Sequence, residues 1–155
     1  EKRPFAAFTT DVMVGFPGET DHHFANTKKA IREAGFMGVH VFKYSPRKGT
    51  PAADYPDQID PPLKSARSKE VMELAERLFA DYARQFLDKE AEVLVEHQDG
   101  DGLWEGHTPN YLLVKFPSDQ ELSNKIVTAR IVKIGNNCVY AEGFEKMINE
   151  CLITE

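Results

Sequence analysis

The sequence predicts an α/β segment followed by a small all-β barrel within one chain of 155 residues. Three observations support this fold class. The chain opens with a strand–helix–strand pattern, a long amphipathic helix follows, and from Ala91 onwards apolar residues alternate with a period of two. The change of period predicts a domain of residues 1–86 and a second domain of residues 87–155.

The opening segment combines β-prone residues with clear turn and cap signals. Phe8–Val14 predicts a strand, and the Gly15-Phe16-Pro17-Gly18 cluster ends it. Thr20 is suited to cap a helix that Gly35 stops, and a second strand is predicted at Val39–Phe42. A strand–helix–strand of this length favours parallel pairing with a right-handed crossover.

A proline-rich loop, Tyr44–Pro62, separates this unit from the strongest helical pattern of the chain. Apolar residues at three- and four-residue spacing predict one amphipathic helix over Leu63–Phe86. After it, four or five short strands with tight turns in about 60 residues predict a small closed barrel. The segments predicted as strands are Glu92–Glu96, Tyr111–Phe116, Ile126–Val132 and Cys138–Ala141, with turns at Asp99–Gly102 and Gly135–Asn137.

The net charge of −6 is unevenly distributed along the chain. Residues 1–86 carry 13 Lys/Arg and 12 Asp/Glu, whereas residues 87–155 carry 6 and 13. The second half is therefore a poor electrostatic clamp for nucleic acid, and any grip on RNA there is expected to be local.

The composition favours a soluble, folded, cytosolic protein with no membrane partner. No apolar run approaches the roughly 18 residues needed to span a bilayer, and the first residues do not resemble a signal peptide. The two cysteines, Cys138 and Cys151, do not form a disulfide framework. Four histidines lack metal-ligand spacing and are expected to be exposed or hydrogen-bonded in the core: His22, His23, His40 and His97.

Three stretches, taken together, resemble the radical S-adenosylmethionine tRNA methylthiotransferases. Thr10–Thr20 (TDVMVGFPGET) is similar to the fifth strand and following turn of the radical domain, and Val41–Ala52 (VFKYSPRKGTPA) to its sixth strand and loop. Gly106–Tyr111 (GHTPNY) resembles the signature of the TRAM domain that closes these enzymes. The resemblance covers nearly the whole chain except a divergent tail after Gly143. It implies a truncated parallel β/α barrel fragment followed by a TRAM, OB-like barrel.

The resemblance implies a reaction that adds a methylthio group to carbon 2 of a hypermodified adenosine beside the tRNA anticodon. His40–Ser45 (HVFKYS) favours the branch acting on N6-threonylcarbamoyladenosine over the isopentenyladenosine branch. A non-enzymatic RNA-binding module is the alternative from a different class. A fragment of the related enzyme that modifies a ribosomal-protein aspartate is a third possibility.

The implied cofactors are S-adenosylmethionine and two 4Fe-4S clusters. Members of the family hold one cluster with a Cys-x-x-x-Cys-x-x-Cys run and the other with three cysteines of an N-terminal domain. This chain has neither set, since Cys138 and Cys151 cannot supply three thiolates to one cluster. The chain alone is therefore expected to be catalytically inactive and to hold no catalytic residue or metal ligand.

The resemblance assigns candidate binding residues to three short segments. The turn Gly15, Phe16, Pro17, Gly18 and Glu19 is expected beside S-adenosylmethionine, and its alternative is a simple strand-to-helix turn. Two further groups are expected to contact the tRNA anticodon stem-loop, and their alternatives are a solvated loop and a β-turn with an anchoring tyrosine. These groups are Lys43, Tyr44, Arg47 and Lys48 in the first domain, and His107, Asn110 and Tyr111 in the second. Trp104 is expected to cover the barrel as a lid.

The first domain is also expected to self-associate. In a parallel sheet, a strand that lacks a neighbour exposes backbone N–H and C=O groups beside apolar side chains. Phe8–Val14 is expected to be such a strand, so edge pairing or exchange of the Leu63–Phe86 helix is predicted for residues 1–86.

Overall fold

The computed structural model describes the backbone of residues 5–150 and the side chains of residues 5–143. Contacts divide this part of the chain into two compact units. The αβ unit is Phe8–Phe79, and the barrel unit comprises residues 5–7 and 80–150. The domain boundary near residue 87 that the period predicts stays a prediction.

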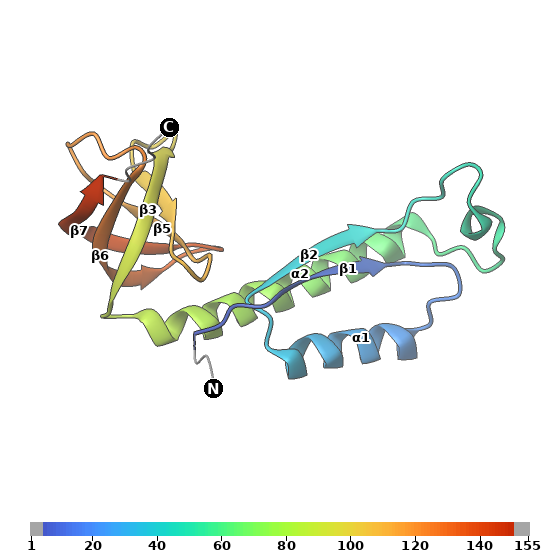
Figure 1. Ribbon diagram of the computed structural model, residues 1–155. Helices are drawn as coiled ribbons and strands as arrows, with labels where there is room; N and C mark the ends of the chain where they lie inside the picture. Colours follow the sequence, from blue (N-terminus) through green and yellow to red (C-terminus); the bar gives the residue numbers. More distant parts are fainter. Residues whose placement is uncertain (1–4, 151–155) are drawn as a thin grey trace. The chain divides into compact units, whose positions relative to one another are not determined.

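The αβ unit contains a two-stranded parallel sheet with two helices on one face (Figure 1). The strands pair in register from Thr9 opposite Gly38 to Val14 opposite Lys43. This confirms the parallel pairing that the strand–helix–strand order predicts. The elements are β1 (Thr9–Val14), α1 (Asp21–Ala34), β2 (Gly38–Lys43), a short 3₁₀ helix (Pro51–Asp54) and α2 (Pro61–Ala83), whose last four residues belong to the barrel unit.

Helix α1 begins and ends at the residues that the cap signals predict. The Thr20 hydroxyl accepts a hydrogen bond from the His23 backbone N–H at 3.2 Å. His23 returns the contact, because its Nδ1 accepts from the Thr20 N–H at 3.4 Å. Gly35 closes the helix in a left-handed conformation with φ 64°. His23 thus completes a reciprocal cap, a role that its residue type does not suggest.

The core of the αβ unit lies between one face of the sheet and both helices. Strand residues alternate, so that Val12 and Val14 are buried whereas Met13 between them is 54% exposed. On β2, Phe42 is 52% exposed and lies opposite Met13. The buried cluster consists of Val12, Val14, Phe24, Ile31, Val71 and Leu74.

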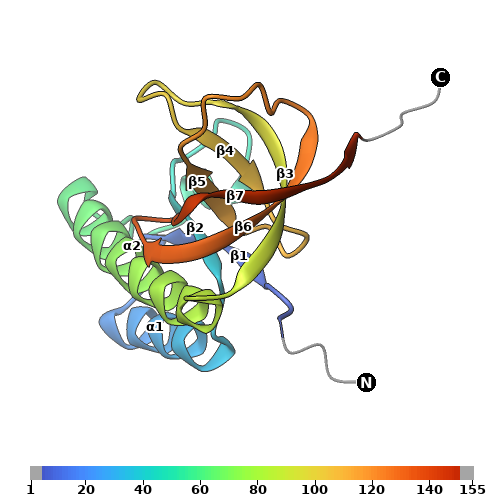
Figure 2. The same ribbon diagram turned by 90° about the vertical axis from the view of Figure 1, so that its left-hand side faces the viewer.

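The barrel unit closes five strands in the order β3-β4-β5-β7-β6 (Figure 2). Neighbouring strands are antiparallel except β5 and β7, which pair in parallel. A closed five-stranded barrel confirms this part of the predicted fold class. A 3₁₀ turn (Arg84–Phe86) precedes the strands, which are β3 (Glu90–Gln98), β4 (Trp104–His107), β5 (Leu113–Phe116), β6 (Lys125–Ile134) and β7 (Val139–Glu150).

A charged cluster ties β5 to the turn between β3 and β4. Lys115 Nζ lies 2.9 Å from Asp99 Oδ2 and 2.8 Å from Glu105 Oε2. The hydrogen bond from Lys115, with the backbone N–H of Leu103, lowers the pKa of Asp99. The bonds to Glu105 and Asp99 in turn raise the pKa of Lys115. Asp99 and Lys115 therefore stay charged near neutral pH, and their ion pair holds the predicted Asp99–Gly102 turn.

Two local expectations for the barrel are corrected by the structure. Trp104 is not a lid but the first residue of β4, and it is only 5% exposed. Tyr111 does not start a strand, because its φ of 67° is incompatible with extended backbone. Beyond Gly143, β7 continues to pair with β6 as far as Glu150. Cys151 lies outside the described residues.

Among the described helices, none is both long and apolar enough to cross a membrane. The αβ unit combines strands and helices as expected. Its origin in a larger β/α barrel stays a prediction.

Candidate functional site

A tight turn with two glycines joins the carboxyl end of β1 to helix α1. Gly15 and Gly18 have φ values of 75° and 78°, which side chains other than glycine rarely adopt. The Glu19 N–H donates to the Phe16 carbonyl oxygen at 2.9 Å, and the Gly18 N–H donates to that of Asp57 at the same distance. Gly15–Glu19, here called the glycine turn, is therefore fixed by its own backbone and by the proline-rich loop.

Glu19 holds the glycine turn through a buried ion pair with helix α2. Its Oε2 accepts from the Gly15 N–H at 3.1 Å, and its Oε1 lies 2.7 Å from Arg67 Nη1. Arg67 Nη1 also donates to the Glu19 carbonyl oxygen at 2.9 Å, and Nη2 donates to Asp21 Oδ1 at 2.8 Å. Arg67 is 3% exposed. One guanidinium thus locks the turn and the start of α1 onto α2.

Arg67 was not predicted as a site residue, and neither was Lys64, one turn earlier in α2. Both lie on the inner face of the helix, because Arg67 is four residues before Val71 and Lys64 is three residues before Arg67, and this spacing is the signal that could have found them. Lys64 is 9% exposed, and its Nζ donates to the Tyr44 carbonyl oxygen at 3.2 Å. A Cβ on Gly15 would collide with the Lys64 stem. Gly15 is therefore required by packing as well as by its backbone conformation.

An aromatic cluster lies where β1 and β2 both end. The Phe16 ring is 41% exposed and meets Tyr44 edge-on at 5.1 Å and Tyr55 at 6.3 Å between centroids. The carboxyl ends of parallel strands are where α/β folds place ligands. Gly18 adds an open backbone surface, because a Cβ there would meet no atom within 4 Å.

The basic residues predicted after β2 are exposed, but their tyrosine is not. Lys43, Arg47 and Lys48 all face solvent. Tyr44 is 8% exposed, and the Lys64 ammonium lies 5.2 Å from its ring centroid. Tyr44 therefore packs inside the αβ unit, and in this conformation its ring is not open to a nucleotide base.

In the barrel unit, the loop between β4 and β5 is organised around buried Thr108. Its hydroxyl accepts from the Leu112 N–H at 3.0 Å and donates to Asn110 Oδ1 at 2.7 Å. Asn110 Nδ2 donates to the Tyr82 hydroxyl at 2.6 Å, which in turn donates to the Phe5 carbonyl oxygen at 3.0 Å. The predicted base contact through Asn110 would have to replace these bonds, so its amide is a structural anchor here.

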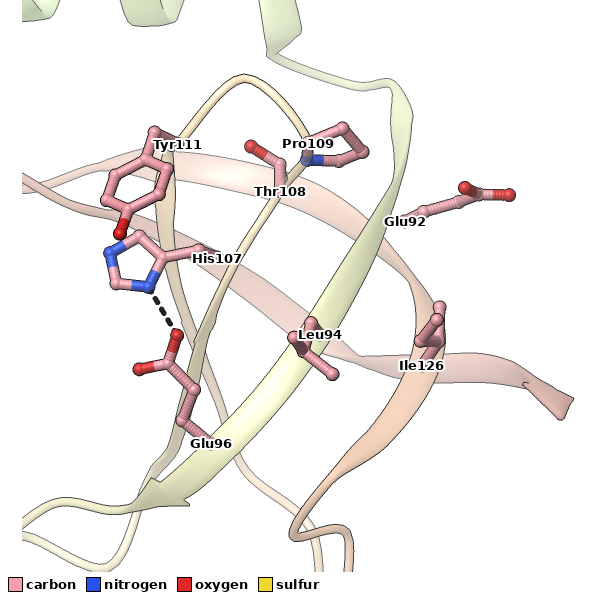
Figure 3. A pocket seen from close by; sticks show the side chains of 8 residues that line it. All are labelled: Glu92, Leu94, Glu96, His107, Thr108, Pro109, Tyr111 and Ile126. Atoms are coloured by element: carbon pink, nitrogen blue, oxygen red, sulfur yellow. Dashed lines mark hydrogen bonds and ion pairs between the residues drawn. The ribbon is translucent and has the colours of Figure 1, made fainter. Parts of the chain in front are cut away.

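His107 and Tyr111, by contrast, face outward at the mouth of a groove (Figure 3). Tyr111 is 73% exposed, and its ring centroid lies 4.8 Å from that of His107. His107 Nδ1 is 2.7 Å from Glu96 Oε1, which orients the imidazole. The groove has a volume of about 360 Å³ and is lined by Glu92, Leu94, Glu96, His107, Thr108, Pro109, Tyr111 and Ile126.

Comparison with known proteins shows what the chain resembles. No family model matches it. It is 38% identical over 98% of its length to the Threonylcarbamoyladenosine tRNA methylthiotransferase MtaB of Bacillus subtilis (strain 168), and it covers 34% of that protein. The chain is thus similar, over most of its length, to proteins named as tRNA methylthiotransferases.

Other methylthiotransferase relatives match most of the chain at similar identity. The tRNA-2-methylthio-N(6)-dimethylallyladenosine synthases of Acidothermus cellulolyticus (strain ATCC 43068 / DSM 8971 / 11B) and Vibrio campbellii (strain ATCC BAA-1116) are 35% and 37% identical over 90% of it. The chain covers 29% and 30% of these proteins. It thus spans about a third of the length of the curated relatives it matches, and the predicted resemblance to tRNA methylthiotransferases is confirmed.

The iron–sulfur clusters associated with methylthiotransferases do not fit the residues of this chain. Its only cysteines are Cys138 and Cys151, and Cys138 is buried in the barrel unit. Within residues 5–143, no three Cys, His, Asp or Glu side chains are grouped to hold a metal ion. No reaction step through a cluster can therefore be assigned to residues of this chain.

Proposed function

We propose that the chain is the C-terminal part of a tRNA methylthiotransferase that acts on carbon 2 of N6-threonylcarbamoyladenosine beside the anticodon. The observation that carries this proposal is the match over 98% of the chain to a relative named for threonylcarbamoyladenosine. Isopentenyladenosine is the second candidate substrate, because relatives named for the dimethylallyl nucleoside match 84–92% of the chain at 34–38% identity. A tRNA substrate also favours a cytoplasmic location.

S-adenosylmethionine would supply the methyl group and the radical-generating sulfonium of this reaction. In this chain, the glycine turn is the proposed contact for it. The exposed Phe16 ring and the open backbone at Gly18 fit the flat ring face of an adenine. The N–H groups of Gly15 and Gly18 already donate to Glu19 and Asp57. The turn would therefore contact the cofactor by its ring and backbone surface, held in place by Arg67.

The sequence of the complete gene tests the proposed reaction class. We expect a Cys-x-x-x-Cys-x-x-Cys run and three further cysteines before residue 1, because this chain cannot ligate a cluster itself. Anaerobic reconstitution of the 155-residue chain with iron and sulfide should accordingly give no stable four-iron cluster. A complete gene without these cysteines would instead favour the non-enzymatic RNA-binding alternative, and a stoichiometric cluster lost on mutating Cys138 would contradict the account.

Arg47 and Lys48 are proposed to contact tRNA phosphates. Each charge removed by Arg47→Ala or Lys48→Ala should weaken tRNA binding by the complete protein. It should also lower the slope of log affinity against log salt by about 1. Titration of labelled tRNA at several salt concentrations measures both quantities.

Lys29→Ala is the matched control for the tRNA titration. Lys29 is an exposed lysine of the same unit whose side chain pairs only with Glu33, at 3.7 Å. If the Arg47 and Lys48 variants bind tRNA with the affinity and salt slope of the Lys29 variant, the basic loop does not contact RNA. The alternative of a ribosomal-protein substrate would then be favoured.

The exposed face of the β1–β2 sheet supports self-association of residues 1–86. Met13 and Phe42 lie opposite each other on this face and are each more than half exposed. We expect residues 1–86 made alone to form dimers or larger species at tens of micromolar, and residues 87–155 to stay monomeric. Light scattering measures both pieces, and a strictly monomeric, cooperatively folding 1–86 piece would contradict the prediction.

A further inference from the structure

The groove on the barrel unit combines an aromatic wall, an apolar floor and an acidic rim (Figure 3). Alternation along β3 places Glu92, Leu94 and Glu96 on the same outer face. Leu94 is 46% exposed and lies opposite Ile126 of β6, so the two side chains form a continuous apolar floor. The aromatic wall consists of His107, the last residue of β4, and Tyr111 in the loop that follows.

Tyr111 is displayed at the groove at an energetic cost. Tyr111 has a φ of 67°, left-handed backbone that is strained for a residue other than glycine, and such strain gathers at functional sites. The conformation is enforced locally, since the Tyr111 N–H donates to the Thr108 carbonyl oxygen at 2.8 Å. The Tyr111 hydroxyl makes no hydrogen bond to any described residue, and its ring is mostly exposed. Neither packing nor hydrogen bonding within residues 5–143 accounts for this tyrosine.

The two rings of the wall present a surface suited to stacking. Tyr111 and His107 are tilted by 34° at 4.8 Å between centroids. His107 is held from the other side by Glu96, so the pair is oriented before any ligand arrives. A planar aromatic ligand would be stabilised by stacking on this surface and by apolar contact with the Leu94–Ile126 floor.

The polar groups of the groove select among such ligands. Glu96 uses Oε1 for His107, which leaves Oε2 to accept, and Glu92 makes no hydrogen bond or ion pair to a described residue. No lysine or arginine lines the groove. A phosphate group would meet like charge here, whereas an amino group could donate to a carboxylate.

We propose that the groove binds one unpaired nucleobase bearing an exocyclic amino group, stacked on Tyr111 and His107 and donating to Glu96 or Glu92. This inference rests on the proposed tRNA function and assigns the barrel unit a base-reading role without phosphate contacts. Adenine, cytosine and guanine carry such a group, whereas two carbonyl oxygens flank the single ring N–H of uracil and would face the carboxylates. A guanidinium or ammonium group is the competing ligand, because it too could pair with Glu92 or Glu96, and an arginine peptide therefore serves as the competing probe in the test.

Short oligoribonucleotides test the inference on the 155-residue chain. Fluorescence anisotropy with labelled hexamers of A, C and U should show A and C binding at least about fivefold more tightly than U. The salt slope should be smaller than that of tRNA on the complete protein, because the groove neutralises no phosphate. Tyr111→Ala should weaken binding of all the hexamers about tenfold, the loss expected for one stacked base.

Glu92→Gln combined with Glu96→Gln should reduce the preference for A and C over U to less than twofold. Glu142→Gln is the matched control, because Glu142 is an exposed glutamate of β7 that does not line the groove. Circular dichroism of each variant should match the unmodified chain, because all four substituted side chains are at least partly exposed.

Three results would overturn the base-binding inference. They are equal affinity for the three hexamers, an unchanged preference in the double glutamine variant, and tighter binding of a tetra-arginine peptide than of any hexamer. If the complete protein binds tRNA while the chain shows one of these results, only the groove assignment fails. If the complete protein also fails to bind tRNA, the proposed function fails with it.

Discussion

Arg67→Ala is expected to destabilise the αβ unit by about 3–5 kcal/mol, a large fraction of the roughly 5–15 kcal/mol by which a domain is ordinarily stable. The Glu19 side chain is only 12% exposed, so the substitution leaves a largely buried carboxylate without its cation. It also removes the bonds from α2 to the Glu19 carbonyl oxygen and to Asp21 at the start of α1. Urea unfolding followed by circular dichroism measures the loss.

Arg84→Ala provides the control for Arg67→Ala. Arg84 pairs with Asp81 three residues earlier, and both side chains are more than 60% exposed. An exposed pair contributes about 0–1 kcal/mol, so the Arg84 variant should unfold close to the unmodified protein. Glu19→Gln in the Arg67→Ala background should recover part of the stability, because it removes the unpaired charge. Equal stability of the Arg67 and Arg84 variants would show that the buried pair does not hold the glycine turn.

Gly106→Ala is expected to destabilise the barrel unit by about 2–3 kcal/mol, the upper part of the range for overpacking. Gly106 lies in β4 opposite Val95 of β3. A Cβ there would collide with the Leu94 carbonyl oxygen and lie 2.8 Å from both its carbonyl carbon and the Val95 Cα. These are backbone atoms, so the strands themselves would have to separate. Thermal unfolding and hydrogen exchange of the β3 and β4 amides report the effect.

Gly100→Ala is the matched substitution in the turn between the same two strands. A Cβ on Gly100 would meet no atom within 4 Å, and its φ is not positive. The stability of the Gly100→Ala variant should therefore stay within about 0.5 kcal/mol of that of the unmodified protein. If Gly106→Ala destabilises the protein no more than Gly100→Ala does, the close approach of β3 and β4 is not what requires glycine at position 106.

The elements with strong local signals could be predicted from sequence. The cap at Thr20, the stop at Gly35 and the strands at Phe8–Val14 and Val39–Phe42 each depend on neighbouring residues, and the structure confirms them. β4 was not predicted because it has four residues, one of them glycine. Its existence depends on pairing with β3 and β5 on either side, which is tertiary information.

The candidate site could be predicted only in its outline. The glycine turn is visible in the sequence, but the partner of Glu19 lies 48 residues away in α2. Helical spacing places Arg67 on the apolar face of α2, but no local pattern identifies Glu19 as the partner of its charge. The same limit applies to Tyr44 and Asn110, whose side chains are used inside their units rather than at the surface. Exposure of Tyr111 depends on a left-handed backbone that the residue type disfavours.

Nucleoside mass spectrometry of tRNA tests the central proposal most directly. A bacterial strain that makes N6-threonylcarbamoyladenosine but lacks its own methylthiotransferase would receive the complete gene that encodes this chain. We predict that the 2-methylthio derivative of N6-threonylcarbamoyladenosine appears, and that the 155-residue chain expressed alone produces none. Accumulation of the unmodified nucleoside alone, with the complete protein folded and its clusters loaded, would contradict the account.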